Sequence, residues 1–148
     1  SCDKSELGEQ NIMLEKNPFN KFKTEDDRFV SYRPTRSIEI LRHIVEPLNC
    51  IINVSNELKW IEVFPILTSY LEWLAGCKNE LIDYFHLRLG EDLPDAWFRN
   101  IEVYSVDITF LTLDDYGATV SFGESLFPDH VIELDFEKYE IDTDRLNG

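Results

Sequence analysis

The sequence predicts a single α+β domain, in which a helical layer packs on a small antiparallel β-sheet. Three observations predict this fold class. Apolar residues recur at helical spacing over residues 66–89, apolar and polar residues alternate over residues 101–137, and hydrophobic residues make up 43% of the 148-residue chain. A chain of this length fits one domain with one core, so we expect residues 1–148 to form a single unit.

Residues 1–36 are predicted to form a polar N-terminal arm. The segment mixes both charges and is interrupted by Pro18 and Pro34, and its bulky apolar residues are mainly aromatic. We therefore expect the arm to pack on the domain through aromatic side chains such as Phe19 and Phe22.

A short helix is predicted over residues 37–47. Ser37 is a suitable N-cap, and Glu39 follows in the first turn. Residues 50–64 are ambiguous: a strand-like run followed by Ser55-Asn56 predicts a hairpin, whereas the polar positions also fit a helix capped by Ser55. The hairpin is slightly favoured, and Pro65 should end either version or begin the next element.

The clearest helix is predicted over residues 66–89, where apolar residues follow alternating spacings of three and four. Gly76 weakens this helix by roughly 1 kcal/mol relative to Ala, so either one long helix tolerates it or two helices meet there. Gly90 stands where a left-handed residue would end the helix.

The C-terminal part is predicted to form a three-stranded antiparallel meander over residues 101–113, 118–122 and 130–137. The sequence Asp114-Asp115-Tyr116-Gly117 predicts the turn between the first two strands. Asp142 and Asp144 are interpreted as exposed turn residues.

The net charge of −15 excludes several classes of partner and is unevenly distributed. Residues 90–148 contain 15 acidic and 3 basic side chains and therefore account for a net charge of −12. Nucleic acid and anionic membrane surfaces would be repelled, so a basic protein is the natural partner. We expect a soluble protein that does not insert into membranes, because no apolar run has the ~20 residues that a membrane span requires. The odd number of cysteines without paired spacing, Cys2, Cys50 and Cys77, predicts reduced thiols and therefore a cytoplasmic location.

The alternation in the last predicted strand should place several carboxylates on one face of the sheet. If Ile132, Leu134 and Phe136 are buried, then Glu133, Asp135 and Glu137 project from the opposite face. Asp107 should do the same from the first strand of the meander. These side chains either bind a cationic partner or form a solvated outer face that keeps the protein soluble.

The sequence contains no recognisable catalytic, cofactor or metal motif. The glycine-rich phosphate loops and the nucleophile elbow are absent, and the three histidines are too far apart in the sequence for a zinc motif. We therefore expect no cofactor, no metal and no enzymatic activity. A hydrolase with an unusual carboxylate site remains an alternative, as does a tethered lipoprotein domain anchored through Cys2.

In its size, acidity and architecture the chain resembles the bacterial immunity proteins that neutralise cationic toxins, including those of contact-dependent growth inhibition. The segment nearest to a signature is DYGATVSFG at residues 115–123, followed by DHVIELDF at residues 129–136. The resemblance implies a stoichiometric inhibitor that covers the active or substrate-binding surface of a nuclease-like toxin. The predicted partner-binding residues are Asp107, Asp114, Asp115, Tyr116, Glu133, Asp135 and Glu137.

Overall fold

The computed structural model describes residues 17–90, 93–124 and 129–147, which form one large sheet covered by helices. Cys2 and the first 16 residues of the predicted arm lie outside these ranges. The sheet has seven strands in the order β1-β2-β5-β6-β7-β8-β9. Its strands are β1 (Phe19–Phe22), β2 (Phe29–Pro34), β5 (Cys50–Ser55), β6 (Glu102–Phe110), β7 (Tyr116–Gly123), β8 (Val131–Glu137) and β9 (Glu140–Asn147).

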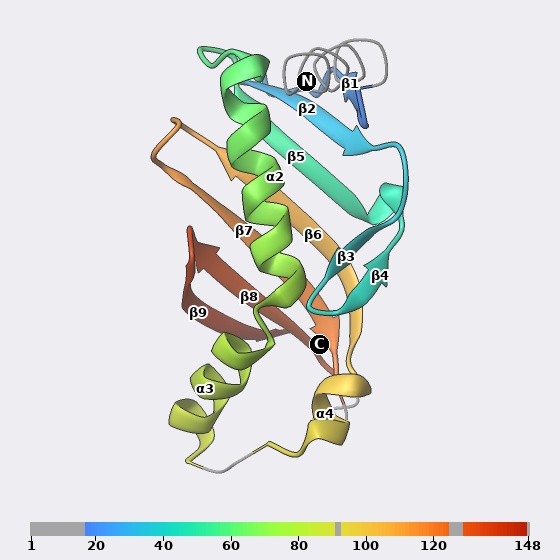
Figure 1. Ribbon diagram of the computed structural model, residues 1–148, viewed down its shortest axis with the longest axis vertical. Helices are drawn as coiled ribbons and strands as arrows, with labels where there is room; N and C mark the ends of the chain where they lie inside the picture. The colour runs from blue at the N-terminus through green and yellow to red at the C-terminus, as the bar shows by residue number, and fades with distance from the viewer. Residues whose placement is uncertain (1–16, 91–92, 125–128, 148) are drawn as a thin grey trace, which may run out of the picture.

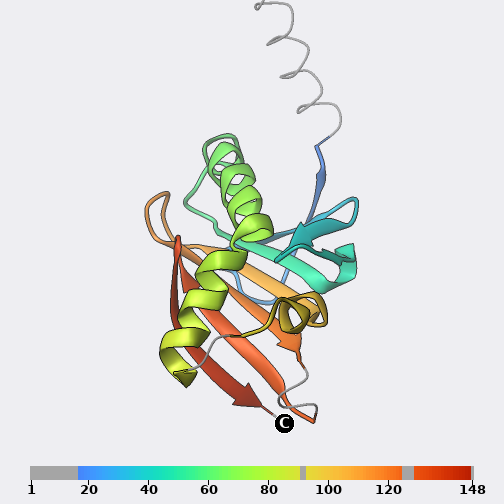
Figure 2. The ribbon, with the colours of Figure 1, turned by 60° about the horizontal axis from the view of Figure 1, so that its bottom comes forward.

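The remaining elements all lie on one side of this sheet (Figures 1 and 2). They are the short strands β3 (Ile38–Ile40) and β4 (His43–Val45), the 3-10 turn η1 (Pro47–Asn49), and the helices α2 (Trp60–Gly76), α3 (Lys78–Leu89) and α4 (Asp95–Arg99).

The order of the strands explains why the helices share one face. β5 and β6 pair in parallel, whereas every other neighbouring pair in the large sheet is antiparallel. A parallel pair needs a long crossover, and here the crossover contains α2, α3 and α4. The α+β class is thus confirmed and the meander β6-β7-β8 is present, but the sheet is mixed and larger than the predicted three strands.

Residues 19–34 of the predicted arm form the hairpin of β1 and β2, which belongs to the large sheet. Its buried aromatic residues pack against the start of α2. The Tyr32 and Trp60 rings stack with their centroids 3.9 Å apart, and Phe19 meets the edge of Trp60 at 5.6 Å. Pro34 is the last residue of β2 and lies beyond its pairing with β5, which ends at Tyr32, so its missing N–H takes no hydrogen bond from that ladder.

The predicted helix over residues 37–47 is also wrong, because this segment forms the hairpin of β3 and β4. At its turn Leu41 and Arg42 have φ angles of 51° and 66°, which no helix allows. Their N–H groups donate to the carbonyls of Leu74 and Ala75, at 2.8 and 2.9 Å. The hairpin therefore satisfies carbonyls that the end of α2 leaves without partners within the helix.

Residues 50–64 match neither alternative over their whole length: β5 is a strand, and α2 begins at Trp60. Pro65 lies inside α2 on its exposed side and neither ends nor starts an element, contrary to the prediction. At Gly76 two helices meet, because α3 begins at Lys78. The left-handed conformation of Gly90 is confirmed by its φ of 73°.

The alternation predicted for the C-terminal strands is confirmed on β8, where Ile132, Leu134 and Phe136 are buried. On β6 it is confirmed except at Tyr104, which is 44% exposed because the pairing register shifts between Val103 and Ser105. The interpretation of residues 142–144 as a turn is wrong: they belong to β9, which extends the meander to a fourth strand.

The core lies between α2, α3 and the covered face of the sheet, where Tyr70 of α2 contacts Tyr116 and Trp73 contacts Phe136. Among the described residues, no helix combines the length and the hydrophobicity needed to cross a membrane.

Candidate functional site

The sheet surface opposite α2 and α3 is called the open face, and none of the described helices covers it (Figure 2). Its side chains are those that alternate with the core residues along each strand. Along β6, β7 and β8 they are Asp107, Thr109, Thr119, Ser121, Glu133, Asp135 and Glu137. The sequence therefore predicted the orientation of the carboxylates on β6 and β8 correctly.

A row of paired residues crosses the open face through Asp107 on β6, Thr119 on β7, Asp135 on β8 and Thr143 on β9. Thr119 Oγ1 donates to Asp135 Oδ1 at 2.7 Å, and Thr143 Oγ1 donates to Asp135 Oδ2 at 3.0 Å. Both oxygens of Asp135 thus accept a hydrogen bond from a neighbouring strand, which fixes the orientation of its carboxylate.

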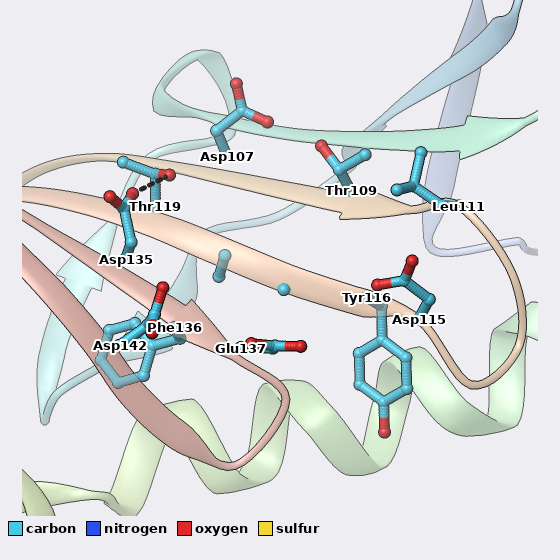
Figure 3. A pocket seen from close by; sticks show the side chains of 12 residues that line it. Asp107, Thr109, Leu111, Asp115, Tyr116, Thr119, Asp135, Phe136, Glu137 and Asp142 are labelled. Atoms are coloured by element: carbon cyan, nitrogen blue, oxygen red, sulfur yellow. Dashed lines mark hydrogen bonds between the residues drawn. The ribbon is translucent and has the colours of Figure 1, made fainter.

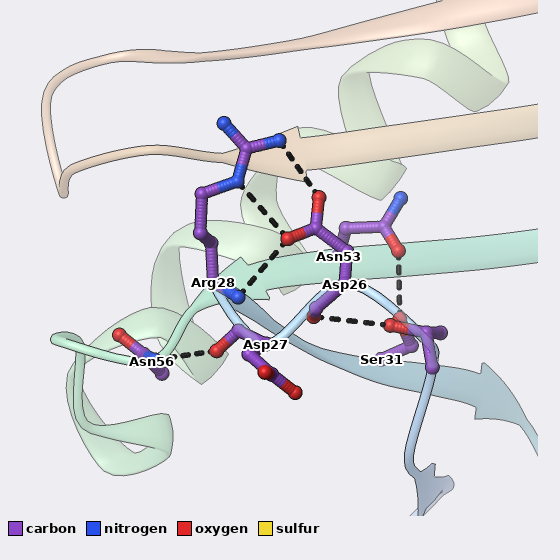
Figure 4. Close-up of polar contacts among 7 residues, drawn as sticks. Asp26, Asp27, Arg28, Ser31, Asn53 and Asn56 are labelled. Atoms are coloured by element: carbon purple, nitrogen blue, oxygen red, sulfur yellow. Dashed lines mark hydrogen bonds and ion pairs between the residues drawn. The ribbon is translucent and has the colours of Figure 1, made fainter.

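Asp107 is held by a separate chain of hydrogen bonds across β2, β5 and β6, of which Figure 4 shows the bond between Ser31 and Asn53. Ser31 Oγ, which is fully buried, donates to Asn53 Oδ1 at 2.7 Å, and Asn53 Nδ2 donates to Asp107 Oδ1 at 2.9 Å. Loss of hydration beside the neighbouring strands raises the pKa of Asp107, and the hydrogen bond from Asn53 opposes part of this effect.

A groove of about 420 Å³ lies on the open face between the β6–β7 turn and the β8–β9 hairpin (Figure 3). Thr109, Gly117 and Thr119 contribute to its lining from the middle strands. Gly117 is required here because an added Cβ would lie 2.3 Å from the carbonyl oxygen of Phe136 on β8. The absence of a side chain at Gly117 lets β7 and β8 pair closely.

The lining of this groove carries negative charge without a positive counterpart, because five of its twelve residues are acidic and, among the described residues, none is lysine or arginine. Its carboxylates come from Asp107, Asp115, Asp135, Glu137 and Asp142. The hairpin of β1 and β2 differs, because its turn pairs Asp26 with Arg28 at 2.8 Å and this arginine lowers the pKa of Asp26 to about 2 (Figure 4). The groove carboxylates therefore present a local excess of negative charge to solvent.

Five of the seven predicted partner-binding residues line the groove: Asp107, Asp115, Tyr116, Asp135 and Glu137. Glu133 lies on the same face of β8 but outside the groove, nearer the start of the strand. Asp114 instead lines a different groove, together with Lys138 and Tyr139.

Tyr116 contributes to the acidic groove, but its ring points toward α2 (Figure 3). Tyr116 is 7% exposed, its ring stacks on that of Phe110 at 4.7 Å between centroids, and its hydroxyl lies 3.5 Å from that of Tyr139. Its backbone, and not its aromatic ring, therefore faces the groove.

Sequence reasoning missed Asp142 and Arg145, both of which lie on β9. Asp142 lines the groove, and Arg145 forms ion pairs with Glu133 at 2.8 Å and Asp135 at 3.0 Å. The available signal was weak, since β9 contains few apolar residues and a register shift interrupts its pairing with β8. The apolar residues of β9, Ile141 and Leu146, are five positions apart and fit no alternation, so the sequence offered no usable indication of a strand.

Other reactive groups lie away from the groove and have structural environments. Burial raises the pKa of the Cys50 and Cys77 thiols to about 12, so both are protonated at neutral pH. On the helical side, Asp144 accepts hydrogen bonds from Tyr84 and Arg88 and so attaches α3 to β9. The described residues contain no group of three or more side chains suited to hold a metal ion.

Comparisons with protein-family models, with curated proteins and with solved structures found no significant match to this chain.

Proposed function

We propose that this chain is a non-catalytic immunity protein that neutralises a cationic, nuclease-like toxin by covering its active or substrate-binding surface. The observation that supports this function best is the groove on the open face, where Asp107, Asp115, Glu137 and Asp142 gather without a lysine or arginine among the described lining residues. The basic partner expected from the net charge would bind at this face.

The chemistry of a nuclease matches such a surface. A protein that binds nucleic acid presents lysine and arginine to the phosphate backbone, and these side chains need an anionic partner when the nucleic acid is absent. The carboxylates of the open face would occupy the positions of the phosphates. Their combined field would also accelerate association, because charge complementarity acts strongly on the rate at which two proteins meet.

The open face also offers apolar contact beside the charges. Leu111, at the end of β6, lines the groove and is 50% exposed. Affinity in protein interfaces comes mainly from a few well-packed anchors, while the surrounding charges give specificity and speed. In this proposal Leu111 packs against the partner, and the carboxylates orient it.

Such an inhibitor would act where the toxin acts, so the proposal includes a cytoplasmic location. The nearest source of a cognate toxin is the neighbouring gene, where a secreted protein with a basic C-terminal domain would be the first candidate. Binding of that purified domain would be measured by calorimetry at 50 mM and 500 mM salt. We expect a 1:1 complex that weakens markedly at high salt; salt-insensitive binding, or no binding to any basic toxin domain, would contradict the proposal.

A matched pair of variants locates the binding surface. The variant D115N/E137Q/D142N removes three exposed carboxylates from the groove, whereas E62Q/E72Q/D83N removes three exposed carboxylates from α2 and α3. Both variants change the net charge by +3. We expect the groove variant to lose roughly tenfold or more in affinity, at up to ~1 kcal/mol per exposed charge pair, and the helix variant to lose much less.

A further inference from the structure

The chain places one of its own guanidinium groups on the acidic open face. Arg145 projects from β9, directly opposite Glu133 of β8. Its Nη2 donates to Glu133 Oε2 at 2.8 Å and to Asp135 Oδ1 at 3.2 Å, and its Nη1 lies 3.0 Å from Asp135 Oδ2. This arginine therefore contacts two carboxylates at once.

The ion pairs of Arg145 divide the open face into two parts. Glu133 and Asp135 share the single positive charge of Arg145, which neutralises part of their charge, and their side chains are only 28% and 24% exposed. Asp115, Glu137 and Asp142 at the groove are exposed and lie outside these ion pairs. One part of the face thus already holds a cation, and the other still presents its negative charge.

Arg145 also shows what kind of group fits this surface. Two carboxylates from one strand, spaced by two residues, bind the two Nη atoms of a single guanidinium. The fork of an arginine matches such oxygen pairs better than the point charge of a lysine does. The face is therefore suited to arginine side chains supplied by another protein.

We propose that Arg145 is an internal competitor, which occupies Glu133 and Asp135 and thereby restricts an arginine-rich partner to the groove of Asp107, Asp115, Glu137 and Asp142. This inference rests on the proposed function and assigns a specificity-determining residue to it. The Arg145 side chain is 52% exposed. Because exposed ion pairs contribute little to stability, removal of Arg145 costs little and frees Glu133 and Asp135 for a cation of the partner.

Removal of Arg145 should therefore improve binding, and the test compares three variants of the full chain. R145Q frees both carboxylates. R99Q removes the same charge from exposed Arg99 on α4, on the helical side of the sheet, and R145K keeps a cation at the original position. The probe is a nona-arginine peptide, and its affinity is measured by calorimetry at low and high salt, with amide chemical shifts recorded to locate it.

We expect R145Q to bind the peptide about three- to tenfold more tightly than the wild type at low salt, as one or two additional exposed charge contacts would give. R99Q should change the affinity less, and R145K should stay near the wild type. Peptide-induced shifts should surround Asp115 and Glu137 in the wild type and spread to Glu133 in R145Q.

A further variant tests whether the gain in affinity comes from the freed carboxylates and not from a change in folding. In R145Q/E133Q/D135N the freed carboxylates are neutralised, so the gain in affinity should disappear while the circular dichroism spectrum stays native. Equal affinities of R145Q and R99Q, with clear binding by the wild type, would overturn this inference alone. If no form binds the peptide, R145Q included, both this inference and the proposed arginine-binding role of the face are wrong.

Discussion

Asn53 donates from Nδ2 to Oδ1 of Asp107 at 2.9 Å, across the pair of strands that run parallel in the large sheet. This bond fixes an acidic side chain at the margin of the groove and connects it to the buried hydroxyl of Ser31. A carboxylate whose pKa is raised is thus kept in place by a polar residue that the sequence analysis did not single out.

Asp107 should make the stability of the protein depend on pH in a defined direction. Its pKa is raised above 3.8 in the folded state, so folding favours the protonated form. The stabilisation exists at low pH and is lost as the pH rises through the folded-state pKa. We therefore expect D107N to be more stable than the wild type at pH 7, by less than about 1 kcal/mol because the carboxyl is partly exposed.

Urea denaturation between pH 3 and pH 7 measures this difference. The advantage of D107N should shrink as the pH falls, whereas the control D83N, at an exposed position on α3, should not show this trend. A difference of constant size across the whole range would show that Asp107 is not the cause.

Ser31 should contribute to stability through Asn53. S31A removes a fully buried hydroxyl and leaves Asn53 Oδ1 without this donor, so we expect a loss of about 1–2 kcal/mol in the free energy of unfolding. S105A, at an exposed position on β6, should change it by less than about 0.5 kcal/mol. Chemical denaturation compares the two, and equal effects would contradict the role given to the Ser31 hydroxyl.

Two glycines should respond in opposite ways to substitution by alanine. In G117A the new methyl group would lie 2.3 Å from the Phe136 carbonyl oxygen, so we expect a loss of about 1–3 kcal/mol as β7 and β8 separate. At Gly76, in the last turn of α2, no atom lies within 4 Å, so G76A should gain up to about 1 kcal/mol. Thermal unfolding measures both, and a G117A protein as stable as the wild type would show that the strands adjust freely.

Arg42 should be replaceable by glycine with a gain in stability. It is exposed and holds a left-handed φ of 66°, which costs a non-glycine residue roughly 1–2 kcal/mol. R42G keeps the N–H that donates to the Ala75 carbonyl. Glycine also raises the entropy of the unfolded chain, which opposes folding, so we expect a net gain in stability of up to about 1 kcal/mol. R42P removes that N–H and excludes the observed φ, and should be clearly destabilised in the same denaturation experiment.

The sequence predicted those elements in which one period of apolar residues extends over many positions. The helical face through Leu67, Tyr70 and Leu74 and the alternation through Ile132, Leu134 and Phe136 are both buried as expected. Asp107, Asp135 and Glu137 line the groove for the same reason, since alternation fixes the face on which a strand side chain lies. Asp115 reaches the groove from the β6–β7 turn, where alternation does not apply.

The errors occurred where tertiary contacts decide the structure. The spacing of Ile38, Leu41 and Ile44 fits a helix, yet Ile44 is 68% exposed and Leu41 is held in a turn by its bond to Leu74, more than thirty positions away in the chain. The strand β5 could not be placed from the sequence because its parallel partner, β6, follows only after the intervening helices. Arg145 was missed because its role depends on the pairing of β9 with β8.

The parallel pairing of β5 and β6 has a consequence for the order of folding. The strands β6 to β9 are neighbours both in the chain and in the sheet, so they form through short loops, whereas β5 reaches β6 only when residues 56–101 close a long loop. Contacts of this kind slow folding, and we expect the C-terminal strands to be structured in the transition state before β5 docks. The carboxylates that line the groove all belong to this C-terminal segment, so the proposed binding surface would be assembled early, before the centre of the sheet is complete.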